Sequence, residues 1–464
     1  MLSTLFLAAV ATSVDPAEVR SDDWLRFRGN QGDSRLDERR YPAEWGPDTN
    51  LAWSAPLPGS GWASPIVVGE RVFVSSAVGE GDIAPRDFSG GVRDPSTRGR
   101  AVRPDGELTF LLTCLSLEDG HEVWTREVGA RVPEHGVHRS NTFATESPCS
   151  DGARVFVTYG ALGALVAYDL EGELLWRAET GVHPTGNNFG WGISPIHADG
   201  LVLLQNDNEA GSFLEAFDAE TGERAWRVER GTGTSWGTPV VWERDGMRQV
   251  VACGPDAVVG YALADGSETW RVQGFGGSFS SSPTVVDQQL VFGNSGPMSR
   301  GPLLAVPHGL EGTIDVKGEG REAVAWRTDR AGPGFASPVS KDGFVYVLGS
   351  STILACHDLA TGERLWRERL PDAAQVVASP WIAGDELHVL DEAGTTFVVP
   401  VGPEFEVTRT NRIEGLYWST PAVAGDSLLL RAADRLHCVR SGVPEPDETS
   451  DGEEAAEGPD RSDP

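Results

Sequence analysis

Short runs of alternating hydrophobic residues, each interrupted by a turn that contains Gly, recur along most of the chain. Three examples are PIVVGERVFVSS (65–76), PIHADGLVLLQN (195–206) and PVSKDGFVYVLG (338–349). Alternation with a period of two residues is typical of half-buried β-strands, and Gly or Asp-Gly between two such runs is typical of a hairpin. Each run therefore predicts a strand, a turn and a second strand.

A Ser-Pro or Thr-Pro pair recurs eight times and opens most of these runs. The prolines are Pro65, Pro148, Pro195, Pro239, Pro283, Pro338, Pro380 and Pro421. Proline is tolerated at the first residue of a strand, where its missing N–H disturbs the ladder least. The eight pairs therefore mark eight equivalent strand starts, and such spacing is the signature of a repeat fold.

A second phrase alternates with the first and predicts the outer part of each repeat. AFDAETGERAW (216–226) and CHDLATGERLW (356–366) are two copies. Asp and Thr-Gly predict a tight turn in which Gly supplies the positive φ, and a strand that ends in Trp follows. Val407 stands where the seventh repeat should have its Trp; the other repeats have Trp53, Trp124, Trp176, Trp226, Trp270, Trp326 and Trp366.

The two phrases together predict four strands in each repeat of about 40–50 residues, the size of a propeller blade. We therefore expect an all-β fold, an eight-bladed β-propeller of four-stranded antiparallel blades over residues 24–441. The last unit (419–442) has only three strands, and the strand around Trp53 has no unit of its own. The N-terminal strand is therefore predicted to complete the last blade, which closes the ring and leaves no long sheet edge.

The net charge of the chain argues against nucleic acids and anionic membrane surfaces as partners. There are 69 Asp and Glu against 38 Lys and Arg, so the net charge is −31. Nucleic-acid-binding proteins need a basic surface, and an anionic membrane surface would repel this chain. Part of the acidity lies in residues 444–464, which have no large hydrophobic residue and are predicted to form a disordered tail.

The N-terminal residues predict export. Leu2–Val14 is an apolar run of the length found in signal peptides, and Ala9-Val10-Ala11 offers a cleavage site, although no basic residue precedes the run. The run is too short to span a membrane, and no cysteine follows it to carry a lipid anchor. We expect residues 1–20 to be a leader, and the protein to be a monomer that is periplasmic, attached to the cell envelope or secreted.

Cysteine and histidine spacing predicts no metal site. The five cysteines are far apart and form no CxxC or haem motif, and His135 and His138 lack a third ligand at zinc spacing. The position of Cys356 in LACHD predicts a small packed residue, because other repeats have small residues there: Ala167, Ala216, Cys114 and Cys438.

The A-x-D-x-x-T-G-x-x-x-W pattern of the second phrase resembles the tryptophan-docking repeat of quinoprotein-type propellers. That group includes pyrroloquinoline-quinone (PQQ) alcohol dehydrogenases and BamB. DWLRFRGNQGDSR (23–35) and HRSNTFATESPCSDGARVFVTYG (138–160) more narrowly resemble PQQ-binding-like propellers of planctomycete-type bacteria, and the similarity covers nearly all of residues 24–440. The resemblance implies an upper face, formed by the loops after the second and fourth strands of each blade, where the enzymes of the group hold cofactor and substrate.

In that layout the candidate site residues gather on the upper face. Six rings stand just before the Ser/Thr-Pro pairs and either surround the channel mouth, where they could stack on a planar ligand, or pack between blades: Trp62, Trp191, Trp236, Phe279, Phe335 and Trp418. The polar candidates are His138, Arg139, Asn141, Glu146, Asn187 and Asn188, with Asp207 and Asn208 assigned to a turn. An insertion in the first blade (79–107) and the segment 132–146 are expected on the same face.

Three functions stay open. The favoured one is a non-catalytic exported propeller that binds a protein, a peptide or a small ligand on its upper face and needs no cofactor. The second is a quinone-dependent dehydrogenase for alcohols or sugars, which would need PQQ and Ca²⁺. Against it, adjacent cysteines and a haem motif are absent from the sequence. The third is carbohydrate binding at the aromatic mouth.

Overall fold

The computed structural model describes residues 20–79, 101–231, 233–244, 246–296, 299–349 and 352–442. The predicted tail (444–464), most of the insertion (79–107) and all of the predicted leader (1–20) except Arg20 lie outside the described residues.

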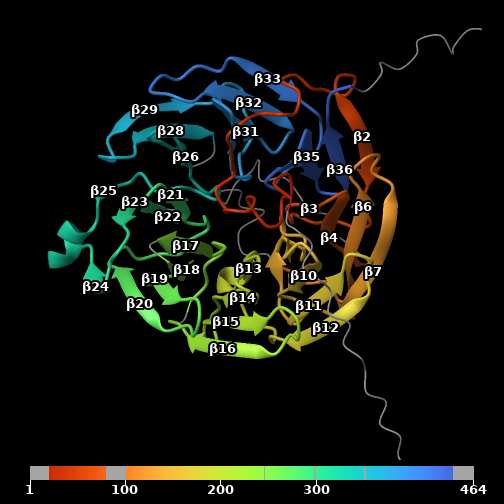
Figure 1. Cartoon of the computed structure of the whole chain (residues 1–464), viewed down its shortest axis with the longest axis horizontal. Coiled ribbons are helices and arrows are strands. Elements are labelled where there is room, and N and C mark those ends of the chain that lie inside the picture. The colour runs from red at the N-terminus through yellow and green to blue at the C-terminus, as the bar shows by residue number, and fades with distance from the viewer. Residues whose placement is uncertain are drawn as a thin grey trace, which may run out of the picture.

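Eight small sheets stand around a common axis as the blades of a disc (Figure 1). The strands are given from the inner to the outer one. Blade 1 has β3 (Ile66–Val68), β4 (Arg71–Gly79), β6 (Leu108–Ser116) and β7 (Glu122–Arg131), and blade 2 has β9 (Cys149–Ser150), β10 (Arg154–Tyr159), β11 (Ala164–Asp169) and β12 (Leu174–Glu179). Blade 3 has β13 (Ile196–Ala198), β14 (Leu201–Asn206), β15 (Phe213–Asp218) and β16 (Arg224–Glu229), and blade 4 has β17 (Val240–Arg244), β18 (Met247–Cys253), β19 (Ala257–Ala262) and β20 (Glu268–Gln273).

Blades 5 to 8 follow in the same order. Blade 5 has β21 (Thr284–Val286), β22 (Gln289–Gly296), β23 (Ser299–Pro307) and β25 (Trp326–Thr328), and blade 6 has β26 (Val339–Lys341), β27 (Phe344–Leu348), β28 (Ile353–Asp358) and β29 (Arg364–Arg369). Blade 7 has β30 (Trp381–Ala383), β31 (Glu386–Leu390), β32 (Thr395–Pro400) and β33 (Arg409–Arg412), and blade 8 has β34 (Ala422–Ala424), β35 (Ser427–Ala432), β36 (Arg435–Val439) and β2 (Leu51–Pro56). The N-terminal β2 pairs antiparallel with β36, so the predicted ring closure is confirmed.

Additional elements extend this plan. β1 (Arg35–Leu36) runs parallel to the inner strand of blade 7, and β24 (Gly312–Asp315) runs parallel to the outer strand of blade 4. These two blades therefore have five strands rather than the four expected. β5 (Ala101–Val102) and β8 (Val137–His138) form a separate ribbon. The described helices are two 3₁₀ turns, η1 (Gly186–Asn188) and η2 (Glu319–Ala323).

The spacing between the Trp and a small residue recurs in the repeats because the two residues pack against each other. In seven sheets the Trp of the outer strand lies opposite a small residue of the next strand, for example Trp176 opposite Ala167 and Trp366 opposite Cys356. The indole N–H of Trp176 donates to the carbonyl of Ala219 in the next blade, and its ring covers Gly222, where a Cβ would lie 2.6 Å from the ring. The outer phrase therefore joins neighbouring blades.

The Ser/Thr-Pro pairs also join blades, through a chain of hydrogen bonds around the channel. The backbone N–H of each Ser or Thr donates to the hydroxyl of the next, at seven junctions and over 2.8 to 3.1 Å. At the junction of blades 8 and 1 the buried Arg431 instead donates to the carbonyls of Ala63 and Ser75. Ser64 Oγ, on the same junction, has no hydrogen-bond partner among the described residues.

The N-terminal segment 23–36 lies inside the central channel, which the sequence did not predict. In Figure 1 this red segment lies inside the ring. Trp24 bridges to Val67 of blade 1, and Arg28 donates to Thr284 Oγ1 of blade 5 and to the carbonyl of Pro338 of blade 6. The segment leaves along blade 7, where the carbonyl of Ser34 accepts from Ile382. The segment therefore reaches from the inner strand of blade 1 to the starts of the inner strands of blades 5 and 6.

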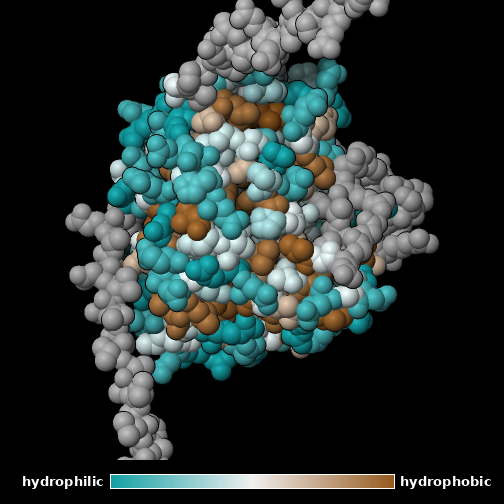
Figure 2. All heavy atoms as spheres, turned by 90° about the vertical axis from the view of Figure 1, so that its right-hand side faces the viewer, coloured by the Kyte–Doolittle hydropathy of each residue, from teal (hydrophilic) through white to brown (hydrophobic). Residues whose placement is uncertain are grey.

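The outer rim of the disc is mixed in character. Figure 2 shows small hydrophobic patches separated by hydrophilic residues on the side that carries β6 and β7. Val123 and Leu174, which precede the Trp of their outer strands, are examples of exposed hydrophobic residues. Scattered single hydrophobic residues are ordinary on a protein surface, so this view of the rim gives no reason to place a site there.

Candidate functional site

A cleft opens on the upper face between blades 2, 3 and 4. We call it the upper cleft, and it has a cavity volume of about 30 Å³. Roughly 10–15 Å³ of such space is needed to hold one water molecule. The cleft is lined by Glu146, Thr158, Gly160, Thr180, Thr185, Gly190, Trp191, Gly192, Ile193, Leu204, Gln205, Asn206, Asp207, Thr234, Ser235 and Trp236. Its enclosed part therefore has room for two or three water-sized groups.

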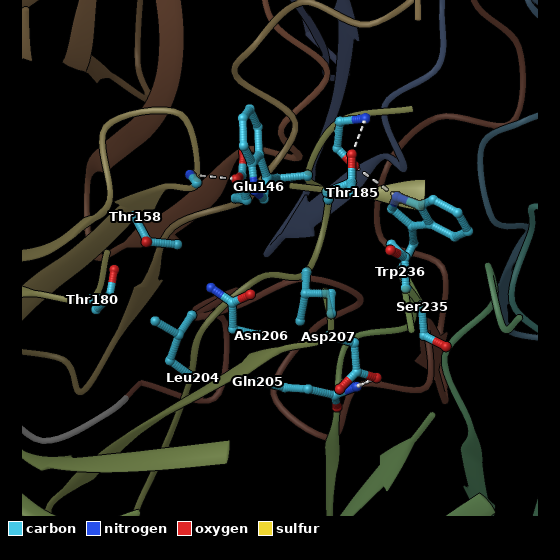
Figure 3. A pocket seen from close by; sticks show the side chains of 16 residues that line it. Glu146, Thr158, Thr180, Thr185, Leu204, Gln205, Asn206, Asp207, Ser235 and Trp236 are labelled. Carbon is cyan, nitrogen blue, oxygen red and sulfur yellow. Dashed lines mark hydrogen bonds between the residues drawn. The ribbon is translucent and has the colours of Figure 1, made fainter. Parts of the chain in front are cut away.

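Glu146 forms one wall of the upper cleft (Figure 3). It directly precedes the Ser-Pro pair of blade 2, and its side chain is 3% exposed. One carboxyl oxygen accepts from the backbone N–H of Gly160 at 2.8 Å and the other from that of Thr145 at 3.2 Å. Burial raises the pKa of Glu146 to about 7, and the two N–H donors offset only part of the rise. Among the described residues, no Lys, Arg or His forms an ion pair with it.

Asp207 lies on another side of the same cleft and has a cationic partner. It follows β14 and is 4% exposed. Its carboxylate accepts from Arg230 Nε at 2.9 Å and from Gln205 Nε2 at 2.8 Å, and Arg230 also donates to the Tyr261 hydroxyl. Burial raises the pKa of Asp207, and the facing guanidinium offsets part of that rise. The charge of this carboxyl is therefore balanced by an arginine of the same chain.

Two of the six predicted rings line the upper cleft. Trp191 is half-buried and donates to the carbonyl of His183 at 3.1 Å. Trp236 is half-buried and donates to the carbonyl of Gly190 at 2.8 Å, so its indole joins blade 4 to the loop before blade 3. The indole N–H groups are thus used internally, and only the ring surfaces are available to a ligand.

The other four rings lie elsewhere. Trp62 and Trp418 stack on each other across the junction of blades 8 and 1, with centroids 5.4 Å apart. Phe279 is buried against Phe275 and Phe292, so it packs in the core between blades. Phe335 is 43% exposed and is not among the residues that line the cleft. The six rings therefore do not form one platform.

The remaining polar candidates do not line the cleft. Asn141 accepts from the N–H of Phe143 and donates to the carbonyl of Phe189. His138 hydrogen-bonds to Ser140 at 2.7 Å, and burial lowers its pKa. Arg139 is half-buried. Asn187 and Asn188 are exposed in η1, and both have a positive φ.

Two features of the cleft differ from the sequence-based interpretation. Asn208 does shape its turn, because its side-chain oxygen accepts from Ala210 and Gly211. Asp207 does not, because it binds Arg230. The sequence could not indicate this pair, since the two residues are 23 positions apart and lie at the ends of different strands.

Comparison with known proteins identifies the family. A family model described as "Outer membrane protein assembly factor BamB" matches residues 108–273, 210–297 and 311–400, which together make up more than half of the chain. The chain belongs to this family. A BamB from Bordetella pertussis (strain Tohama I) is 23% identical over 373 residues, which cover 77% of this chain and 79% of that protein.

Solved structures agree on the fold. BamB from Moraxella catarrhalis has a TM-score of 0.51 at 12% identity, and the match covers 79% of this chain and 98% of that one. A quinohemoprotein alcohol dehydrogenase from Comamonas testosteroni has a TM-score of 0.61 at 12% identity, over 94% of this chain and 84% of that one. At such identities the likeness shows the propeller alone. In the described ranges, no helix is long and apolar enough to cross a membrane.

The residues of the upper cleft do not fit a quinone with Ca²⁺. Calcium takes six to eight oxygen ligands. Within the described part of the chain, no three His, Cys, Asp or Glu side chains are grouped to hold a metal ion. Asp207 is held by Arg230, so its carboxylate charge is already balanced within the chain. The described cysteines are all free and buried, so none presents a disulfide to a ring.

Proposed function

We propose that this member of the BamB family is an exported, non-catalytic scaffold that binds a protein or peptide partner on its upper face. The observation that carries the proposal is the upper cleft, where the rings of Trp191 and Trp236 are held by internal hydrogen bonds and stay half-exposed. Such a surface suits recognition, because interfaces are enriched in aromatic residues that are already held in place.

The location follows from the same comparison. The relative's name places it in the assembly of outer membrane proteins. We propose a corresponding place in the cell envelope for this chain, outside the cytoplasm, in agreement with the apolar run at 2–14. An anionic protein would not bind anionic lipids directly, so the proposed contact is with protein.

Site-specific photo-crosslinking tests the proposed face. A photoreactive residue replaces Ala210, which is exposed in the upper loop of blade 3, or Glu220, which is exposed in the lower turn of the same blade. In cell envelopes of the producing organism, the variant at 210 should give a discrete adduct that the variant at 220 does not give. Equal adducts from both positions, or none from 210, would contradict the proposed face.

A quinone-dependent dehydrogenase is the alternative to be removed. Purified protein is incubated with PQQ and Ca²⁺, separated from free quinone, and assayed for quinone absorbance and for dye-linked oxidation of alcohols and sugars. The proposal expects neither retained quinone nor turnover. Stoichiometric retention that is lost in Trp236→Ala would overturn the non-catalytic assignment.

A further inference from the structure

The upper cleft holds two buried carboxyls, and only one of them has a cation. Asp207 faces Arg230, whose guanidinium is almost as buried as the carboxylate. Glu146 is equally buried but has only two backbone N–H donors. A buried carboxylate is normally paired or hydrogen-bonded to a cation, because removal from water disfavours its charge. The cleft therefore has one acceptor more than the chain's own cations serve.

The surroundings of Glu146 favour a cation with N–H donors. Each carboxylate oxygen accepts one N–H and keeps the capacity for another bond. Trp191 and Trp236 line the same cavity, and aromatic rings attract cations. Gln205 also lines it, and its side-chain oxygen has no hydrogen-bond partner among the described residues. In Figure 3 Glu146 lies above the space, Gln205 below it and Trp236 beside it.

The size of the cavity favours an ammonium group over a guanidinium group as the cation. A volume of about 30 Å³ has room for an ammonium group and its attached carbon. A guanidinium is larger and planar and would need space for its fork of five N–H groups. The net charge of −31 favours the approach of a cationic partner.

We propose that the upper cleft receives a primary ammonium group, the tip of a lysine side chain of the partner polypeptide, with Glu146 as its counter-ion. The inference rests on the proposed function and adds the chemistry by which the partner is recognised. The ammonium donates to the carboxylate of Glu146 and lies against the rings of Trp191 and Trp236. The partner's lysine would do at this wall what Arg230 does for Asp207.

Tryptophan-selective NMR tests the inference. The probe is the peptide N-acetyl-Gly-Lys-Gly-amide, with the same peptide carrying Nε-acetyl-lysine as its uncharged control. Protein with ¹⁵N-labelled indoles is titrated, and the Trp191 and Trp236 signals are assigned from Trp→Phe variants. The lysine peptide should shift both signals saturably. The acetylated peptide should bind with an affinity at least about ten-fold lower, since a charge-assisted hydrogen bond is lost.

Two variants make the test specific. Glu146→Gln keeps the shape of the side chain, removes the charge and should weaken binding of the lysine peptide about ten-fold or more. Glu209→Gln removes an exposed charge that accepts from Thr234 at the cleft edge, and should leave affinity within about two-fold. Unchanged indole signals elsewhere show that each variant is folded.

Three results would overturn the inference: equal affinity for the two peptides, undiminished affinity in Glu146→Gln, or no saturable shift of the Trp191 and Trp236 signals. None of them bears on the proposed face, which the crosslinking at Ala210 tests by itself. An adduct at 210 together with no lysine binding would mean that a partner uses the upper face without inserting an ammonium group.

Discussion

The two buried carboxyls of the upper cleft show how the same burial has different consequences in the two halves of one site. On the side of blades 3 and 4, Asp207 and Arg230 form an internal ion pair. On the side of blade 2, Glu146 is held by backbone N–H groups alone, and its pKa rises to about 7. The first arrangement is complete within the chain. The second leaves a carboxyl whose charge a partner can stabilise.

The N-terminal segment inside the channel supports this view. There the chain inserts its own Arg28 between blades 5 and 6, where the hydroxyl of Thr284 and the carbonyl of Pro338 accept from it. The propeller therefore already holds one of its own cationic side chains inside its channel. At the upper end the described residues supply no such side chain to Glu146.

The largest expected effect is on the paired carboxyl. Asp207→Asn leaves the Arg230 guanidinium buried without its counter-ion, and breaking a buried ion pair costs about 3–5 kcal/mol of the free energy of unfolding. Urea unfolding at pH 7.5 measures it. The exposed pair of Arg177 with Glu179 is the control, because Glu179→Gln should cost less than about 1 kcal/mol. A loss below about 1 kcal/mol for Asp207→Asn would show that the pair is not the stabilising contact described.

Substitution of the unpaired carboxyl, Glu146, should raise stability where substitution of Asp207 lowers it. Because the pKa of Glu146 rises from 4.5 to about 7, the folded state binds more protons than the unfolded state between these values. Its contribution to stability therefore falls as pH rises through this window, by about 3 kcal/mol in total. Glu146→Gln removes this dependence, so the variant should gain stability relative to the wild type from pH 5 to pH 8.

Urea unfolding of both proteins at several pH values measures this difference. Tyr159, the titratable group near Glu146, does not interfere, because burial raises its pKa well above this range. A constant difference between wild type and Glu146→Gln from pH 5 to pH 8 would contradict the unpaired state of the carboxyl.

The smallest expected effect compares paired and unpaired hydroxyls of the inner ring. Ser194→Ala removes the acceptor for the buried N–H of Ser147 and should cost about 1–2 kcal/mol. Ser64→Ala removes a hydroxyl without a partner among the described residues and should leave stability unchanged or slightly higher. Thermal unfolding of the two variants side by side measures the difference. Equal losses would mean that the hydroxyl ring does not stabilise the blade junctions.

The sequence predicted the fold well because its signals are local. The turn at Asp218–Gly222 and the Trp at 226 fix one blade edge within a few residues, and the repeat multiplies the signal. The filled channel could not be predicted in this way. Its contacts, such as those from Arg28 to Thr284 and Pro338, join residues more than 250 positions apart and have no periodicity.

The site was predicted only in part for the same reason. Trp191 and Trp236 are predicted from their places before the Ser/Thr-Pro pairs and Glu146 as a polar residue of an upper loop, and all three line the cleft. Phe279 occupies the same place in its repeat but points into the core, since Phe275 and Phe292 surround it. Whether a ring at this position faces the channel or the core depends on neighbours that the repeat pattern does not encode.

The most direct test of the account is the pKa of Glu146 with and without a lysine ligand. Protein with ¹³C-labelled glutamate carboxyls, assigned with Glu146→Gln, is titrated alone, with N-acetyl-Gly-Lys-Gly-amide and with the acetylated peptide. The account predicts a pKa near 7 for the protein alone and a fall of about one unit or more with the lysine peptide only, because an adjacent cation favours the carboxylate. An ordinary pKa in the free protein, or one that the lysine peptide does not change at saturation, would contradict it.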